Sequence, residues 1–319
     1  MKVHWQPGAT PDVLRMRAAL LATIRQFFNT GNVLEVETPL LCSSGVTEPA
    51  IAPLVVTSGQ SIVSTRYLQS SPEYAMKRLL AAGSGPIYQI ARAFRDGEAG
   101  GRHNPEFSML EWYRPGFDHH ELMKEVEQLL VACLGEKPVR RFSYRELFQQ
   151  FVNIDPFTCS DQELANLACS AVDLNFSSAE RDVWLDLILS HLIEPSLAGC
   201  GYCFVYDYPA SQAALSRLVP ADDVIVGQRF EVYVDGMELA NGYCELTDPA
   251  EQRSRFETEN RRRLTLGLPE QPVDELLLAA LAAGMPDCSG VALGVDRLLM
   301  VLGGKSDIGD VLAFDWGRC

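Results

Sequence analysis

The sequence predicts an α+β fold in which an antiparallel sheet is flanked by helices. Strand-like apolar segments follow one another closely in two places, at 87–94 with 107–113 and at 229–234 with 237–245. Longer segments with helical spacing lie around these pairs instead of alternating with single strands, which favours α+β over a doubly wound sheet. Asp235 and Gly236, between the second pair, form the strongest short hairpin signal in the chain.

The other elements follow in order along the chain. Thr10 and Pro11 begin a helix that Gly31 ends, and a strand at 33–36 is stopped by Pro39. Ser71 is the expected N-cap of a helix over 72–82. Further helices are expected at 119–134, 144–151, 161–172, 179–193, 248–266 and 274–283, with strands at 204–208 and 288–293 and a final helix from Val295. We interpret residues 1–319 as one catalytic domain with a helical insertion at roughly 144–200.

Composition is that of an ordinary globular protein, with 47% hydrophobic and 22% charged residues. No apolar run approaches the roughly 20 residues of a membrane span, and the first residues do not resemble a signal peptide. Nine cysteines without a disulfide framework fit a reducing compartment, so a cytoplasmic protein is expected. Cys200 and Cys203 could form half of a zinc site, but buried thiols are the simpler interpretation.

The formal net charge of −15 opposes binding to a polyanion. It therefore makes tRNA an unlikely main partner, because nucleic-acid binding depends on neutralising phosphates. The basic runs at 140–141 and 261–263 could still form a small docking patch, although such runs are more often solvated.

The predicted hairpin brings two acids together. With a two-residue loop, Tyr233 faces Glu238 and Glu231 faces Ala240, so the two glutamates are diagonal neighbours about 7–8 Å apart at the backbone. Two carboxylates on one face suit Mg²⁺, although a pair of solvated acids is an equally simple interpretation. Glu245 would fall on the opposite face unless a bulge at Asn241 and Gly242 resets the alternation.

Two arginines suggest a site that binds a polyphosphate. Neither a Walker motif nor a dinucleotide-binding glycine motif occurs, so a bound nucleotide would be held in another way. Arg95 ends an apolar strand, and Arg297 lies in the first turn of the final helix. For either arginine alone, a surface ion pair is the simpler interpretation. Their combined order and spacing favour convergence on a nucleotide.

These segments carry a family resemblance. Phe94 and Arg95, with residues 102–107, resemble motif 2 of the class II aminoacyl-tRNA synthetases, and residues 290–297 resemble motif 3. Residues 71–73, Tyr113 and residues 238–245 are most similar to the lysyl branch. The resemblance covers about residues 12 to 316 and implies the class II catalytic core, ATP and Mg²⁺. The first helix and strand resemble motif 1, which implies a homodimer.

The resemblance also implies roles for individual residues. Arg95 and Arg297 would be the catalytic pair, on the α- and γ-phosphate respectively. The residues implied to bind ATP are Arg95, Asp96, Gly97, Asn104, Glu238, Leu239, Gly294 and Arg297, with Glu231 and Glu238 as Mg²⁺ ligands. The residues implied to bind the amino acid are Ser71, Pro72, Glu73, Tyr113, Glu245 and Ala292. The amino-acid carboxylate would itself attack, so no protein nucleophile is required.

Three features separate this chain from lysyl-tRNA synthetases. No anticodon-binding domain is expected before motif 1. Gly97 stands where motif 2 has glutamate, so either Glu98 replaces it through a shifted loop or backbone groups alone contact adenine. Ala292 replaces a glycine of motif 3, and its methyl would crowd α-lysine beside the amino group. The chain thus resembles the paralogues that attach lysine or (R)-β-lysine to a lysine of elongation factor P. The alternatives are a truncated synthetase that charges tRNA and a non-catalytic regulatory module.

Overall fold

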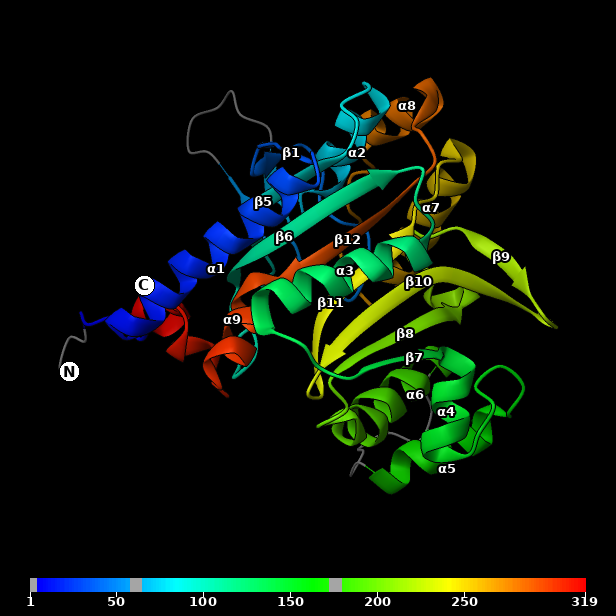
Figure 1. Ribbon diagram of the computed structural model, residues 1–319. Coiled ribbons are helices and arrows are strands. Elements are labelled where there is room, and N and C mark those ends of the chain that lie inside the picture. The colour runs from blue at the N-terminus through cyan, green and yellow to red at the C-terminus, as the bar shows by residue number, and fades with distance from the viewer. Residues whose placement is uncertain (1–4, 58–64, 172–179) are drawn as a thin grey trace. The chain divides into compact units, whose positions relative to one another are not determined.

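The computed structural model describes residues 5–57, 65–171 and 180–319 (Figure 1). The chain divides into two units. Unit 1 consists of Met1–Phe117, Ala132–Leu134 and Leu246–Cys319, and unit 2 consists of Asp118–Val131 and Gly135–Glu245. The polar segments with which the chain resembles motifs 2 and 3 both lie in unit 1, whereas the predicted acidic hairpin lies in unit 2.

Unit 1 contains four strands of the main sheet in the order β1-β5-β6-β12. They are β1 (Leu34–Glu35), β5 (Ile87–Phe94), β6 (Glu106–Pro115) and β12 (Cys288–Gly294). The pairs β5–β6 and β6–β12 are antiparallel, and only the short β1 runs parallel to its neighbour β5. The predicted pairing of the strands at 87–94 and 107–113 and the predicted strand at 288–293 are therefore confirmed.

One face of this sheet is covered by the long first helix, α1 (Pro11–Thr30), and by the last one, α9 (Val295–Gly303) (Figure 1). Thr10 caps α1, as predicted, and its side chain accepts a hydrogen bond from the Val13 N–H. The buried Phe28 ring stacks on Tyr88, 4.4 Å between centroids, and meets the edge of Trp112 at 5.3 Å. These contacts leave the opposite face of the sheet available for polar side chains.

The other helices of unit 1 are α2 (Glu73–Ala81), α7 (Pro249–Thr265) and α8 (Glu275–Gly284), all close to their predicted ranges. The prediction that Ser71 is the N-cap of α2 is wrong, because Pro72 occupies that position. The Ser71 hydroxyl instead accepts a hydrogen bond from the Glu73 N–H at 3.0 Å. A small sheet in the order β2-β4-β3 was not predicted; it consists of β2 (Leu41–Cys42), β3 (Val55–Val56) and β4 (Arg66–Leu68).

Unit 2 contains strands in the order β11-β10-β8-β7, with β9 paired to β10. They are β7 (Val139–Ser143), β8 (Tyr202–Pro209), β9 (Leu218–Ala221), β10 (Val224–Val234) and β11 (Met237–Cys244). Most of α3 (His119–Leu134) also belongs to this unit, and its predicted range is confirmed. Strands β7 and β9 were not predicted, and β10 begins five residues before its predicted start.

A helical layer packs on one face of β8 and β10. It contains α4 (Tyr144–Val152), α5 (Asp161–Ala171), α6 (Arg181–Ile188), a π-helical turn at Leu189–Ile193 and a 3₁₀ turn at Glu194–Leu197. The predicted helix ends at residues 172 and 179 lie outside the described residues. The core of this layer includes Tyr144, Phe148, Trp184, Ile188, Cys203, Val205, Tyr208 and Tyr233. Cys203 is thus a buried thiol, and burial raises its pKa to about 12.

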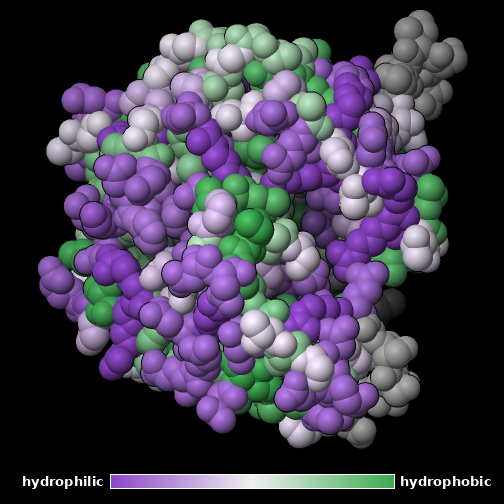
Figure 2. All heavy atoms as spheres, turned by 90° about the vertical axis from the view of Figure 1, so that its right-hand side faces the viewer, coloured by the Kyte–Doolittle hydropathy of each residue, from purple (hydrophilic) through white to green (hydrophobic). Residues whose placement is uncertain are grey.

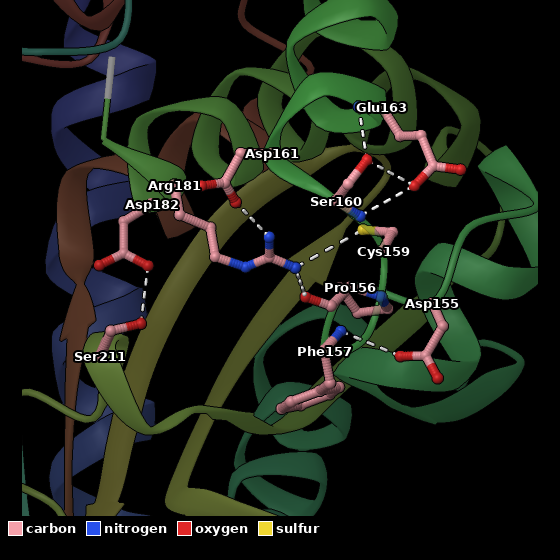
Figure 3. Close-up of polar contacts among 10 residues, drawn as sticks. All are labelled: Asp155, Pro156, Phe157, Cys159, Ser160, Asp161, Glu163, Arg181, Asp182 and Ser211. Atoms are coloured by element: carbon pink, nitrogen blue, oxygen red, sulfur yellow. Dashed lines mark hydrogen bonds and ion pairs between the residues drawn. The ribbon is translucent and has the colours of Figure 1, made fainter.

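Arg181 joins the beginning of α6 to the loop before α5 (Figure 3). Its guanidinium donates to the Pro156 carbonyl at 2.8 Å and to Asp161 Oδ1 at 2.5 Å. It also donates to Cys159 Sγ at 3.6 Å. Arg181 therefore links α6 to the loop that precedes α5 and to the first residue of α5.

The surface in Figure 2 is mostly hydrophilic, with small separate groups of hydrophobic residues, in keeping with the formal net charge of −15. Over the described parts of the chain, no helix combines the length and apolar character needed to cross a membrane.

Candidate active site

The face of the unit 1 sheet opposite α1 carries a buried carboxylate, Glu111, which is 2% exposed. Ser71 donates its hydroxyl proton to Glu111 Oε2, and Tyr113 donates to Oε1, both at 2.7 Å. Glu111 and Tyr113 are two residues apart on β6 and therefore share a face. The structure thus joins two residues predicted to bind the amino acid, through a glutamate that sequence reasoning missed.

Ala292 lies directly across from Glu111, because β12 pairs with β6 in the register Ala292↔Glu111 and Gly290↔Tyr113. Paired residues of neighbouring strands present their side chains to the same face. The Ala292 methyl therefore points to the side on which Glu111 and Tyr113 form their hydrogen bonds. This position is compatible with the predicted contact to a substrate amino group.

Glu73, in the first turn of α2, faces a buried lysine. Lys77 Nζ lies 2.6 Å from Glu73 Oε1, and the Lys77 side chain is only 1% exposed. The two residues are one helical turn apart, so their side chains meet on one face of the helix. The sequence pattern gave no signal for this partner, because an i, i+4 glutamate–lysine pair is normally a solvated surface feature.

Arg95 follows the end of β5, and its backbone N–H donates to the Pro105 carbonyl at 2.9 Å. Its guanidinium lies over the Phe107 ring, 5.2 Å from the centroid, and 3.7 Å from a Glu98 oxygen. Among the described residues its buried Nε has no hydrogen-bond partner. A buried donor of this kind costs free energy unless it meets an acceptor, so the position fits a phosphate oxygen of ATP.

Gly97 and Asp96 form the turn after Arg95. Gly97 has φ +76°, a backbone conformation that residues other than glycine rarely adopt. Asp96 is held by its backbone N–H, which donates to the Ala52 carbonyl at 2.8 Å. Because Glu98 is directed to the Arg95 guanidinium, this geometry favours backbone groups over Glu98 for an adenine contact.

Arg297 is held against the loop that precedes β6, although 194 residues separate it from His103. Its guanidinium lies 2.6 Å from His103 Nε2, and its Nε donates to the Arg102 carbonyl at 3.3 Å. Burial lowers the pKa of His103, and the Arg297 charge lowers it further. A neutral imidazole can accept the hydrogen bond from Arg297. The segments that resemble motifs 2 and 3 therefore meet here.

Asn104 is bound on both sides by the protein itself, whereas Gly294 has room for a side-chain carbon beside its backbone. The Asn104 side chain donates to the Glu106 carbonyl at 2.6 Å and accepts from the Trp316 N–H at 2.8 Å, so both ends of its amide are used within the protein. Gly294 has an ordinary backbone conformation at the N-cap of α9. A Cβ there would meet only the Arg297 side chain, at 3.8 Å, so the fold itself does not require glycine.

In unit 2 the β10–β11 hairpin corrects one predicted pairing. Tyr233 faces Glu238, as predicted, but Glu231 faces Asn241 and not Ala240. The register shifts between Val232 and Tyr233, which leaves Leu239 as the extra residue of a bulge. The bulge predicted at Asn241 and Gly242 is therefore wrong in position. Glycine in a strand only suggests a bulge, whereas cross-strand pairing decides where the extra residue lies.

The bulge restores the alternation that Glu245 requires. After Leu239, residues 241 and 243 pair with residues 231 and 229, so they share the face of Glu231. Continuing this alternation places Glu245 on the same side, immediately beyond β11. Glu245 is 1% exposed and forms an isolated bridge with Ser216. The predicted association of Glu245 with the acidic face is thus compatible with the structure, by a different route.

Glu231 is held by three side chains. Tyr208 donates to Oε2 at 2.7 Å, Tyr233 donates to the same oxygen, and Arg229 donates to Oε1. Burial, together with the Glu231 charge, raises the pKa of both tyrosines well above the usual value, so they remain donors. A carboxylate has about four acceptor sites, so Glu231 can still approach a cation.

The acidic side chains near Glu231 could bind Mg²⁺ only together with other ligands. Throughout the described residues, no three acidic, histidine or cysteine side chains are grouped so that they could hold a metal ion. Glu231 and Glu238 could supply two carboxylates, and Mg²⁺ commonly binds one or two carboxylates together with substrate phosphates. The residues therefore fit a cation that arrives with a nucleotide.

An antiparallel sheet with an arginine loop at one strand end and a second arginine in the helix after the last strand defines a class II synthetase catalytic core. The chain belongs to the class II tRNA synthetase family of the D, K and N types, whose model matches residues 4–316. The fold class and the family predicted from the sequence are thereby confirmed.

The chain is also similar to curated relatives along their whole length. Proteins named elongation factor P–(R)-β-lysine ligase from Salmonella paratyphi B, Klebsiella pneumoniae and Salmonella enteritidis PT4 are each 48% identical to it. Each match covers 98% of this chain and 98% of the relative.

Proposed function

We propose that this chain is an ATP-dependent ligase that activates (R)-β-lysine or lysine as an adenylate. It then transfers the aminoacyl group to the ε-amino group of a lysine on elongation factor P. The observation that carries the proposal is 48% identity, over 98% of both chains, to relatives named for this ligase activity. The hydrogen-bonded Ser71, Glu111 and Tyr113, with Glu73 nearby in sequence, supply an acidic surface suited to a diamino acid.

In the first step, the substrate carboxylate oxygen bonds to the α-phosphorus, and the bond from that phosphorus to the bridging oxygen breaks, releasing pyrophosphate. Arg95 would stabilise charge on the α-phosphate, because its buried Nε needs an acceptor. Arg297, oriented by His103, would bind the γ-phosphate. Glu231 and Glu238 would hold Mg²⁺, which when bound offsets the charge of the phosphates.

In the second step, the acceptor amine nitrogen bonds to the carbonyl carbon, the bond to AMP breaks, and the amine loses a proton to solvent. Neither step needs a nucleophile from the protein. Alignment and electrostatic stabilisation are sufficient contributions for such a reaction.

The amino group of the substrate is proposed to lie beside Ala292. The methyl opposite Glu111 narrows the space on that face by one carbon. This supports (R)-β-lysine over α-lysine, whose amino group is one carbon closer to the carboxylate. One methyl group in a pocket accounts for about 1–3 kcal/mol of discrimination.

Two assays on the same preparation test the proposal. ATP–pyrophosphate exchange is measured with (R)-β-lysine and with α-lysine, and labelled amino acid is then offered with purified elongation factor P or with lysine tRNA. We expect exchange with a preference for (R)-β-lysine and transfer to the protein only. Transfer to tRNA would instead identify a truncated synthetase, and absence of exchange would identify a non-catalytic module.

A further inference from the structure

A two-stranded arm projects from unit 2. It consists of β9 and the first residues of β10, joined at Asp222 and Asp223 (Figure 1). The register is Val224↔Ala221, Ile225↔Pro220, Val226↔Val219 and Gly227↔Leu218.

Both faces of the arm are apolar. Val219 and Val226 form one face, and Val226 is buried at 3% exposure. The opposite face carries Leu218, 40% exposed, and Ile225, 49% exposed, next to the exposed Pro220. A sheet with one face on the core normally presents polar side chains to water on the other. Three adjacent apolar side chains on the outer face therefore indicate a contact surface.

The base of the arm is connected to the predicted amino-acid site. Arg217 lies directly before β9, and its backbone N–H donates to the Cys244 carbonyl at 2.9 Å while its Nε donates to the Glu245 carbonyl at 2.9 Å. Ser216 bridges Glu245, and a Cβ at Gly227 would clash with Ala213 at 2.7 Å. The arm therefore has little freedom at its base, and whatever it binds is held at a defined position relative to Glu245.

The edge of the arm is unsuited to adding a strand. Strand β9 has only four residues, and Pro220 has no N–H to donate. Within the described residues β9 pairs with β10 alone. The contact surface is thus the side-chain face, which we define as the arm face: Leu218, Pro220 and Ile225.

The acidic tip suggests the charge of the occupant. Asp222 and Asp223 are both exposed, and only one basic side chain, Arg145, is paired to this tip in the described structure, 2.8 Å from Asp223. The ion pair offsets the charge of Asp223 and leaves the exposed charge of Asp222. An apolar face beside this negative charge complements a surface that presents apolar residues beside a lysine. The acceptor in the proposed reaction must present a lysine.

We propose that the arm face is the docking surface for the acceptor protein and that it positions the acceptor lysine for transfer. This inference rests on the proposed ligase function. The partner is a folded protein with an apolar patch next to the lysine that becomes modified. The arm takes no part in adenylate formation.

The test is the paired variant Leu218→Thr with Ile225→Thr, which places β-branched side chains suited to a strand at both positions but removes apolar surface. Pyrophosphate exchange should stay within twofold of wild type. The KM for the acceptor protein should rise about tenfold or more, as expected for loss of central interface side chains. The matched control is Leu276→Thr on α8, which is 52% exposed in unit 1 and should change neither value.

Each other outcome has a separate meaning. An acceptor KM within twofold of wild type, or an equal rise in the Leu276 variant, overturns the docking surface. A shift of the paired variant to a smaller oligomer in light scattering also overturns it, since the arm would then bind a second copy of this chain. Wild-type protein without exchange or transfer contradicts the proposed function and not the arm. A single variant, Asp222→Asn, tolerates the positive φ of 51° at this residue and removes its charge. It should raise the acceptor KM with unchanged exchange, which separates docking from a folding defect of the arm.

Discussion

Lys77 changes how Glu73 can recognise an amino group. A lone carboxylate attracts any ammonium, whereas Glu73 already has its Oε1 bound to a buried Lys77. If Glu73 Oε2 binds the substrate amino group, the strength of this contact depends more on the orientation of the carboxylate than on its net charge. Lys77 is therefore a positioning residue in our interpretation, because it restrains the Glu73 side chain.

We predict that Lys77→Met lowers kcat/KM for the amino acid by about tenfold or more, although the site becomes more negative. The reason is that Glu73 loses its fixed orientation. The KM for ATP should change less than twofold, and Lys77→Arg should restore part of the activity. Tighter amino-acid binding in Lys77→Met would contradict this role, because attraction by charge alone would then dominate. Pyrophosphate exchange at varied amino-acid concentration is the measurement.

Gly294 and Gly97 allow a matched comparison. Gly294→Ala should change the free energy of unfolding by less than about 1 kcal/mol relative to wild type. The φ of Gly294 is negative, and an added methyl would meet only the flexible Arg297 side chain. If the nucleotide approaches this backbone, the KM for ATP should nevertheless rise severalfold. Gly97→Ala should instead destabilise the protein by about 1–2 kcal/mol, because φ is positive there. Denaturant unfolding and exchange kinetics separate the two. An unchanged ATP KM in Gly294→Ala would remove that residue from the site.

The contact between His103 and Arg297 predicts a pH dependence. The pKa of folded His103 lies below the unfolded value of about 6.5, so the folded state binds this proton more weakly. The contribution of His103 to stability is therefore present above pH 6.5, roughly, and is lost as pH falls through the folded pKa. Arg95, Arg102 and Arg297 oppose protonation, whereas Glu98 favours it.

We expect the KM for ATP to rise on the acid side as protonated His103 repels Arg297. His103→Gln retains an acceptor but does not titrate, so this acid limb should disappear from its pH profile. A limb that persists in the variant belongs to another group. The measurement is exchange at saturating amino acid across the pH range.

At the scale of elements, the hairpin of β10 and β11 shows how a single inserted residue arranges a site. Without the Leu239 bulge, Glu231 and Glu245 would lie on opposite faces. With it, Glu231, Glu238 and the position of Glu245 fall on one side. The loop was predictable because Asp235 and Gly236 both adopt positive φ, as a two-residue hairpin turn requires.

Glu238→Gln tests the cation role of this face. It preserves shape and removes one charge, so adenylate formation should slow by a barrier increase of a few kcal/mol. Higher Mg²⁺ concentration should rescue part of the activity if the loss lies in cation binding. The control is Glu251→Gln, an exposed acid on α7 in unit 1, which should have no effect. Exchange within twofold of wild type in Glu238→Gln would contradict the assignment.

Long elements were predictable and short ones were not. The helices α1, α3 and α4 and the strands β5, β6 and β12 carry caps or enough alternation for their ranges to be recognised. The strands β2, β3 and β4 have two or three residues each, so they carry no periodicity. They exist because neighbouring segments in unit 1 offer them hydrogen-bond partners. Pro72 and not Ser71 is the N-cap residue of α2, although the Ser71 hydroxyl accepts from the Glu73 N–H and donates to Glu111.

At the scale of the whole molecule, a homodimer remains a prediction from the motif 1 resemblance. Unit 1 exposes large apolar side chains on β1 and on the small sheet: Leu34 at 57%, Leu41 at 52% and Val55 at 54%. A dimer formed through these apolar side chains would join two chains that each carry a net charge of −15 and therefore repel each other. Screening by salt should therefore strengthen association.

We predict that Leu41→Lys with Val55→Lys yields monomers in light scattering at concentrations where wild type is dimeric. Raising the salt concentration should favour the wild-type dimer. The control is Leu264→Lys, which is 55% exposed on α7 and should leave the mass unchanged. A monomeric wild type at high salt, or an unaffected paired variant, would contradict the prediction.

The sequence by itself determined the fold class, the family and the identity of both arginines, because those depend on local periodicity, caps and motif spacing. It also indicated the acids of the hairpin. The tertiary structure alone decided which of these residues meet. Glu111 joins Ser71 to Tyr113, His103 holds Arg297 across 194 residues, and Leu239 shifts the register of a strand. Burial makes the contacts of Glu111 necessary, since a buried acceptor or charge must find a partner wherever the folded chain offers one. The other two follow from which segments the fold places side by side. Burial at a given residue is a property of the packed chain as a whole, and local sequence patterns do not contain it.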